Sequence, residues 1–186
     1  MRITIKEMVL TALFVALIVI GTFIKIPVPY VPFTLQLMFT MFAGLLLGPR
    51  LGALAVIIYL VLGLLGVPVF AEGGGISYIF KPTFGYLIGF VFGTYATGYI
   101  ANRDARPSVK RLLCANLLGL VIVYTFGLIY LYLVRSLYLF NPIGIWQLFF
   151  YGMILPIPGD LIICVGGAFI GQRLIPMVKN SYSHSV

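Results

Sequence analysis

Charged residues are scarce in this chain of 186 residues. They make up only 9% of the sequence, against roughly a quarter in soluble domains. Apolar residues make up 62%, and the mean hydropathy is +1.14. Such a chain cannot cover a water-facing surface, which excludes a soluble globular domain. Its long apolar runs also exclude a transmembrane β-barrel, because barrel strands alternate apolar with polar residues.

Catalytic and metal-binding motifs are also missing. The sequence has no G-x-x-x-x-G-K-[ST], no H-E-x-x-H and no G-x-S-x-G. The one histidine, His184, lies in the polar tail, and Cys114 and Cys164 lie inside apolar runs. The basic stretch 103–111 lacks the aromatic residues of a nucleic-acid surface. We therefore expect no enzyme activity, no cofactor, no metal site and no nucleic-acid partner.

Apolar segments long enough to cross a bilayer fill most of the chain. A crossing helix needs about 20 apolar residues. Six apolar segments are present, at about 8–24, 33–48, from the turn at 48–52 to 66, 83–100, 112–134 and 145–175, of which the second and third are short at about 16 residues each. We predict an all-α polytopic protein with six transmembrane helices in one domain, 1–178. A polar tail, 179–186, should be disordered. The first segment resembles a signal peptide, but five more follow, so we interpret it as a retained span.

The basic residues predict an orientation. Six spans place both termini on one side of the membrane, and the positive-inside rule makes that side the cytoplasm of the cell. The proline-rich stretch 25–32 and the glycine-rich stretch 67–82 then face outside. Nine basic residues fall on the inner side and three on the outer: Arg2, Lys6, Arg50, Arg103, Arg106, Lys110, Arg111, Arg173 and Lys179 against Lys25, Lys81 and Arg135.

Asp160 is the residue that most strongly indicates a binding site. A carboxylate within an apolar span costs several kcal/mol unless it faces a cavity or a partner. Arg173 should mark the inner end of this span, and 13 residues of helix place Asp160 about 20 Å above it. Pro156, Pro158 and Gly159 interrupt the helix just before the carboxylate. We expect Asp160 to accept N–H groups of a ligand from outside; the alternative is a structural carboxylate that closes a helix break.

Other polar residues fall near the same level. Gln36 and Tyr86 lie about one turn into their spans from the outer side, and Tyr124 lies 13 residues above Arg111, also about 20 Å up. These side chains could line one pocket with Asp160; the alternative for the tyrosines is an interfacial belt. Asn116, near the inner side, is expected to form a helix–helix hydrogen bond.

The outer loops offer further candidate ligand contacts. Gly73, Gly74 and Gly75 allow backbone N–H groups to approach a ligand, and with Lys81 they could hold a carboxylate at the rim. A flexible turn is the alternative. Apolar walls could come from aromatic residues, namely Phe33, Phe70 and Tyr78.

Small residues mark one face of the first span. Ala12 and Ala16 have the small-xxx-small spacing that allows another helix to approach closely. The pattern is common in membrane helices, so it fits internal packing or chance as well as a partner surface.

These residues form a set of motifs that resembles the BioY family, the biotin-specific S components of energy-coupling-factor (ECF) vitamin transporters. The resemblance covers nearly the whole chain. Its motifs are Val31-Pro-Phe-Thr-Leu-Gln36, Leu47-Gly-Pro-Arg-Leu-Gly52, the block from Gly63 to Gly75, Pro82-Thr-Phe-Gly-Tyr-Leu-Ile-Gly-Phe90 and Pro158-Gly-Asp-Leu-Ile162. Where the family usually continues with lysine after the last motif, this chain has Ile163.

The resemblance implies a function for these positions. Asp160 would bind the ureido group of biotin in a pocket open to the outside of the plasma membrane. Ala12 and Ala16 would dock on a transmembrane T component, and two ATP-binding-cassette ATPases would drive import. The resemblance also implies that the whole subunit topples in the membrane during transport. The alternatives are an S component for another small vitamin, an intramembrane enzyme acting on lipid or peptide, and a membrane scaffold.

Overall fold

The computed structural model describes residues 3–26, 30–104 and 106–183. Within these residues the regular secondary structure is helical apart from one two-stranded hairpin and an isolated bridge between Phe70 and Gly73, so the all-α expectation is confirmed. Three short elements are not α-helical: η1 (Ile76–Phe80) is a 3₁₀ helix, and η2 (Val134–Tyr138) and η3 (Phe150–Ile154) are π-helices. The elements in order are α1 (Ile5–Phe23), β1 (Lys25–Ile26), β2 (Phe33–Thr34), α2 (Gln36–Leu64), η1 (Ile76–Phe80), α3 (Phe84–Ala101), α4 (Val109–Leu133), η2 (Val134–Tyr138), α5 (Ile145–Phe149), η3 (Phe150–Ile154) and α6 (Ile157–Ser183).

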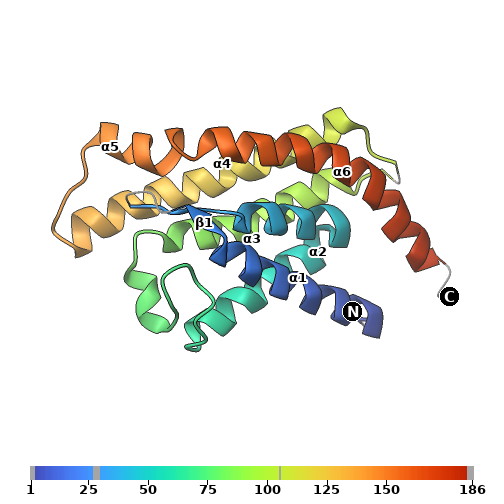
Figure 1. The fold of residues 1–186 in the computed structure, drawn as a ribbon, viewed down its shortest axis with the longest axis horizontal. Coiled ribbons are helices and arrows are strands. Elements are labelled where there is room, and N and C mark those ends of the chain that lie inside the picture. Colours follow the sequence, from blue (N-terminus) through green and yellow to red (C-terminus); the bar gives the residue numbers. More distant parts are fainter. Residues whose placement is uncertain (1–2, 27–29, 105, 184–186) are drawn as a thin grey trace.

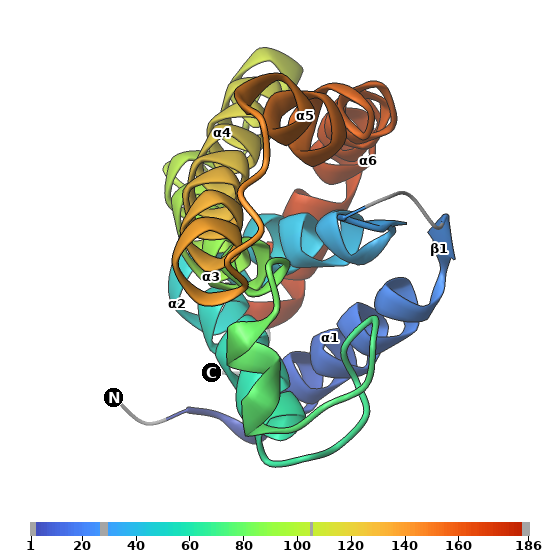
Figure 2. The same ribbon diagram turned by 90° about the vertical axis from the view of Figure 1, so that its left-hand side faces the viewer.

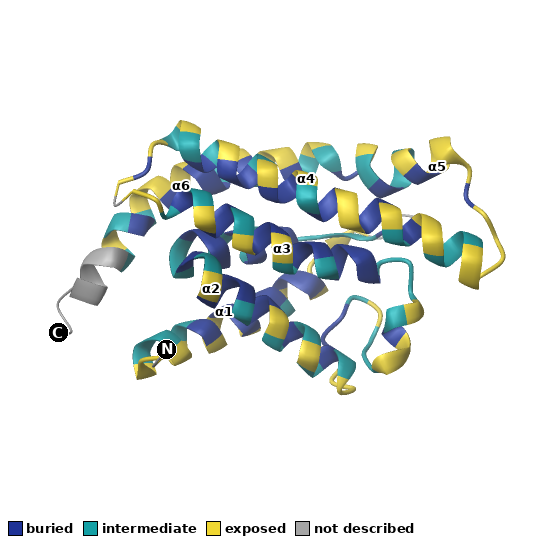
Figure 3. Ribbon diagram, turned by 180° about the vertical axis from the view of Figure 1, so that it is seen from behind, coloured by how far each residue is buried: buried dark blue, intermediate teal, exposed yellow. Residues whose placement is uncertain are grey.

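The helices pack around α3. This helix contacts α2 on one side and α4 on the other, α1 packs on α2, and α6 packs on both α4 and α2 (Figure 1). Buried residues lie where the helices face one another, and exposed residues lie on their outer faces (Figure 3). Many of the exposed residues are large and apolar. An apolar surface of this extent is unfavourable in water and suits contact with lipid.

Five helical segments in the described part of the chain are long and apolar enough to cross a membrane: Ile5–Phe23, Gln36–Leu64, Phe84–Ala101, Val109–Tyr138 and Ile145–Val178. The sequence predicts six, because it divides the second of these at the turn 48–52. The structure also has a break there: Gly48 has φ 81° and ψ −179°, so α2 consists of two helical segments that meet at a kink. The count of six membrane crossings stays a prediction.

The kink in α2 is held by the end of α3. Pro49 has no N–H, which leaves the carbonyl of Leu45 without its helical partner. The Asn102 side chain supplies one, since its Nδ2 donates to the carbonyls of Leu45 and Gly44 at 3.1 and 3.3 Å. Gly98 contacts the same point, because a Cβ there would lie 2.7 Å from the Pro49 nitrogen.

The proline-rich stretch forms a hairpin rather than a helix in its described residues, as predicted. Strands β1 and β2 pair antiparallel, with Lys25 opposite Thr34 and Ile26 opposite Phe33. Residues 27–29 lie outside the described residues. In both ribbon views the hairpin lies between α1 and the α5–α6 run, at the side of the molecule that carries the glycine-rich stretch (Figure 2).

The last helix begins and ends differently from the prediction. The interruption expected over 156–160 is shorter, because α6 starts at Ile157 and takes Pro158 and Asp160 into its first turn. Proline fits a first turn, where its missing N–H has no helical partner. At the other end α6 continues to Ser183, into the tail that we expected to be disordered; residues 179–183 contain no glycine or proline to end it. Residues 184–186 lie outside the described residues.

Candidate functional site

A cavity opens between the helices beneath the hairpin. Its empty space is about 630 Å³, including the part open to the surroundings, which falls within the range of roughly 300–1,000 Å³ typical of small-molecule sites. Four helices, the hairpin and the 71–83 segment contribute its lining residues: Val31, Pro32, Phe33, Thr34, Gln36, Leu37, Ala71, Tyr78, Thr83, Tyr86, Leu87, Phe90, Val123, Tyr124, Pro156 and Asp160.

Asp160 lies in the wall of this cavity and is only 7% exposed. The Tyr124 hydroxyl donates a hydrogen bond to its Oδ2 at 2.5 Å. The sequence predicts the same height for these two residues on different helices, and the structure joins them by this bond. The carboxylate thus has one protein donor on one oxygen and lies beside open space, an arrangement suited to accepting further donors.

Gln36 brings hydrogen-bond donors to the same cavity. It is the first residue of α2 and is 3% exposed. Its Nε2 is buried and has no hydrogen-bond partner within the described chain. The Gln36 side chain lies beside the Tyr59 hydroxyl, and its unpaired donor is a candidate for pairing with an acceptor on a ligand, because most buried polar groups in folded proteins are paired.

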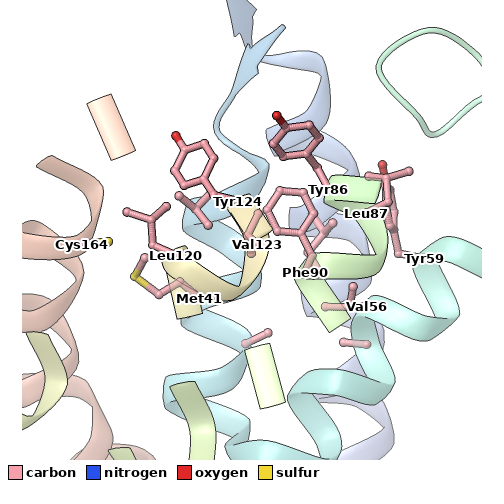
Figure 4. Close-up of a cluster of buried hydrophobic side chains, with 14 of the residues drawn as sticks. Met41, Val56, Tyr59, Tyr86, Leu87, Phe90, Leu120, Val123, Tyr124 and Cys164 are labelled. Atoms are coloured by element: carbon pink, nitrogen blue, oxygen red, sulfur yellow. The ribbon is translucent and has the colours of Figure 1, made fainter. Parts of the chain in front are cut away.

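Tyr86 lies in the wall but uses its hydroxyl elsewhere. Its hydroxyl donates to the carbonyl of Gly152 at 2.8 Å. The ring fills the space over Gly127, where a Cβ would lie 2.3 Å from Cε1. The hydroxyls of Tyr86 and Tyr124 point to the same side in Figure 4, above a layer of buried apolar side chains. Both hydrogens are used within the protein, and Gln36 remains as the donor toward a ligand carbonyl.

Aromatic side chains supply the apolar walls. Phe33 packs against the backbone beside Asp160, because a Cβ on Gly159 would lie 2.6 Å from Cζ of its ring. Tyr78 also lines the cavity and is buried, and this burial raises the pKa of its hydroxyl. Phe70 packs behind Tyr78, with ring centroids 4.5 Å apart, and is not part of the lining.

The three glycines and Lys81 lie beside the cavity without lining it. The N–H of Gly73 donates to Phe70, and the N–H of Gly75 donates to Gly63. Lys81 forms an ion pair with Glu72 at 2.6 Å. The glycine-rich segment instead contributes Ala71 and Tyr78 to the wall.

Several lining residues were not singled out from the sequence. Phe90 lies four residues after Tyr86 and three after Leu87, the spacings that place residues next to each other on one face of a helix. That spacing could have identified them. Thr83 and Val31 belong to the motifs quoted above, but their residue types alone do not mark them as cavity-lining, because their places depend on how two loops fold over the helices.

Two predictions lie outside the cavity. Ala12 and Ala16 are exposed on the outer face of α1, whereas the opposite face of that helix is buried. Asn116 is fully buried, and its Nδ2 donates to the carbonyl of Cys164 at 2.8 Å. The expected helix–helix hydrogen bond is therefore confirmed, and it joins α4 to α6.

Comparison with known proteins gives matches over nearly the whole chain. Residues 1–180 match the model of the BioY family. A probable biotin transporter BioY of Lysinibacillus sphaericus is 41% identical over 94% of this chain and 89% of its own length. One from Pyrococcus horikoshii is 39% identical over 91% of this chain and 96% of its own length.

A solved structure matches the fold as well. The crystal structure at 2.1 Å of the S component for biotin from an ECF-type ABC transporter superposes with a TM-score of 0.77. It is 28% identical, and the match covers 93% of this chain and 94% of that one. With a family model and close relatives that both span nearly the full length, this chain belongs to the BioY family.

Proposed function

We propose that this chain is the biotin-binding S component of an ECF-type uptake transporter and that the cavity at Asp160 captures biotin. The observation that carries the proposal is the pairing of a buried acceptor, Asp160, with a buried unpaired donor, Gln36, in one cavity wall. Family membership and the names of the relatives support biotin as the ligand.

The cavity offers complementary groups for each part of biotin. The ureido ring carries two N–H donors, which Asp160 can accept, and one carbonyl, to which Gln36 Nε2 can donate. The apolar bicyclic ring fits walls formed by Phe33, Tyr78 and Phe90. Because the carboxylate holds its place through Tyr124, the acceptor is already oriented when the ligand arrives.

ATP-driven import would need partner subunits, since the sequence has no phosphate loop of its own. A transmembrane T component and two ATP-binding-cassette ATPases would supply the energy, and the exposed strip at Ala12 and Ala16 would dock on the T component. Six crossings, with both termini in the cytoplasm and the cavity facing outside, are supported by the common end of the molecule at which α1 starts and α6 ends (Figure 1).

Equilibrium binding of radiolabelled biotin to purified protein tests the proposal. Asp160→Asn should weaken binding by about 10- to 150-fold, because a hydrogen bond to a charged group contributes roughly 1.5–3 kcal/mol. Asp104→Asn makes the same chemical change in an exposed acid of the α3–α4 connection and should leave binding unchanged. Unchanged affinity in the Asp160 variant would remove this residue from the site. Tighter binding of another vitamin would assign a different ligand.

A further inference from the structure

The cavity lacks a positive charge to receive the acid group of biotin. Among the described lining residues, Asp160 is the only one with an ionisable acidic or basic side chain of the Asp, Glu, Lys or Arg kind, and it is an acid. A ligand carboxylate placed beside it would be repelled, and burying that charge unpaired would be costly. If the proposed function is right, the carboxylate must therefore lie at the rim of the cavity, where a cation can meet it.

Lys25 lies at this rim. Its backbone pairs with Thr34 across the hairpin, and its Nζ donates to the carbonyl of Ala71 at 2.5 Å. Thr34 and Ala71 both line the cavity. The Lys25 side chain thus spans from one lining segment to the other, and the residue is exposed.

The charge of Lys25 is not neutralised by an acid. An ammonium has three donors, and one of them is used on Ala71. Within the described chain no carboxylate pairs with Lys25. Lys81, on the other side of the same turn, differs in this respect because its Nζ pairs with Glu72 and also donates to the Glu72 carbonyl. The charges of Lys25, Lys81 and Glu72 therefore sum to a single net positive charge at this turn.

We propose that Lys25 receives the carboxylate of bound biotin and makes the site selective for a ligand that is anionic at this end. The contact would join the hairpin, the ligand and the 71–72 turn. It would also explain how a cavity whose interior carries an acid can hold an anionic vitamin. Asp160 would accept the N–H groups of the ureido ring, and Lys25 would pair with the carboxylate at the rim.

The test compares biotin with biotinamide, which has a neutral carboxamide in place of the carboxylate. Lys25→Gln should weaken biotin binding by about three- to tenfold, in the range of a partly exposed charge pair, and change biotinamide binding by less than about twofold. Lys25→Arg keeps the charge and should keep the preference for biotin. The loss should shrink at high salt. Thermal unfolding checks that the variants are folded.

Lys81→Gln is the matched control, because it removes the same charge from the same rim. It should weaken both ligands alike or neither. If Lys25→Gln weakens biotin and biotinamide binding equally, Lys25 has a purely structural role and the proposal is overturned. It is also overturned if only Lys81→Gln weakens biotin binding more than biotinamide binding. Equal affinity of the unaltered protein for both ligands would overturn it and leave the proposed function standing, whereas no biotin binding at all would refute the proposed function itself.

Discussion

At the scale of single residues, the site depends on three polar side chains whose hydrogen-bonding capacities differ. Asp160 accepts from Tyr124, and Gln36 has an unpaired donor. A buried donor without a partner destabilises a protein by about 1–3 kcal/mol. The free protein therefore carries a cost at Gln36 that ligand binding would remove.

Gln36→Met should make the unliganded protein more stable and the biotin complex weaker. The change replaces an unpaired amide by an apolar side chain of similar length, and Tyr59 beside it keeps its hydrogen bonds to Thr22 and Val69. A gain of about 1 kcal/mol corresponds to roughly 2–4 °C in the unfolding midpoint. Thermal unfolding in detergent, with and without biotin, measures both effects.

Thr94→Val is the control for this trade-off, because the buried Thr94 hydroxyl donates to the Thr40 carbonyl at 3.2 Å and its loss should lower the unfolding midpoint. If Gln36→Met also lowers the midpoint of the unliganded protein, the amide is serving the fold rather than the ligand.

At the scale of elements, the position of the site depends on how closely α3 approaches α4. Gly85, Gly89 and Gly93 lie four residues apart along α3 and face α4. A Cβ on Gly89 would lie 2.8 Å from the Cα of Val123, and one on Gly93 would lie 2.9 Å from the carbonyl of Gly119. Small residues at this spacing allow backbones to pack closely in membranes. They bring the cavity-facing side chains of the two helices together.

Gly89→Ala should lower stability by about 1–3 kcal/mol and weaken biotin binding, because the added methyl group meets backbone atoms that cannot rotate away. Gly166→Ala in α6 is the matched control: nothing lies within 4 Å of its Cβ position, and alanine favours a helix by up to about 1 kcal/mol. Unfolding midpoints and biotin affinities of both variants test this. Equal behaviour of the two alanine variants would mean that the close approach does not position the site.

At the scale of the whole molecule, the two ends differ in character. The start of α1, the kink of α2, the α3–α4 connection and the end of α6 lie at one end, while the hairpin and the glycine-rich stretch lie toward the other (Figure 1). Binding and docking therefore use separate parts of the surface. The cavity opens beneath the hairpin, and Ala12 and Ala16 lie on the outer face of α1.

Replacing Ala12 and Ala16 by tryptophan should abolish biotin uptake by cells that contain the partner subunits and leave biotin binding by the purified chain unchanged. Bulky side chains would prevent another helix from approaching, whereas neither residue lines the cavity. Val121→Trp on the exposed face of α4 is the control and should leave uptake intact. Normal uptake in the double variant would show that docking uses another surface.

The helical membrane character of the chain can be predicted from its sequence, and so can the common height of Asp160 and Tyr124. Both follow from local rules: apolar runs are long enough to span a bilayer, and a fixed rise per residue sets the heights of Asp160 and Tyr124. The break at Gly48 and Pro49 also follows from local chemistry, since proline lacks an N–H and glycine tolerates positive φ.

Which polar groups are used within the protein, and which face the cavity, depends on the tertiary structure. Tyr86 donates to Gly152, Lys81 pairs with Glu72, and Lys25 reaches Ala71, 46 residues away along the chain. A hydrogen bond joins atoms within about 3 Å of each other. Whether two side chains meet at that distance depends on how separate helices and loops pack, which residue spacing along one element does not specify.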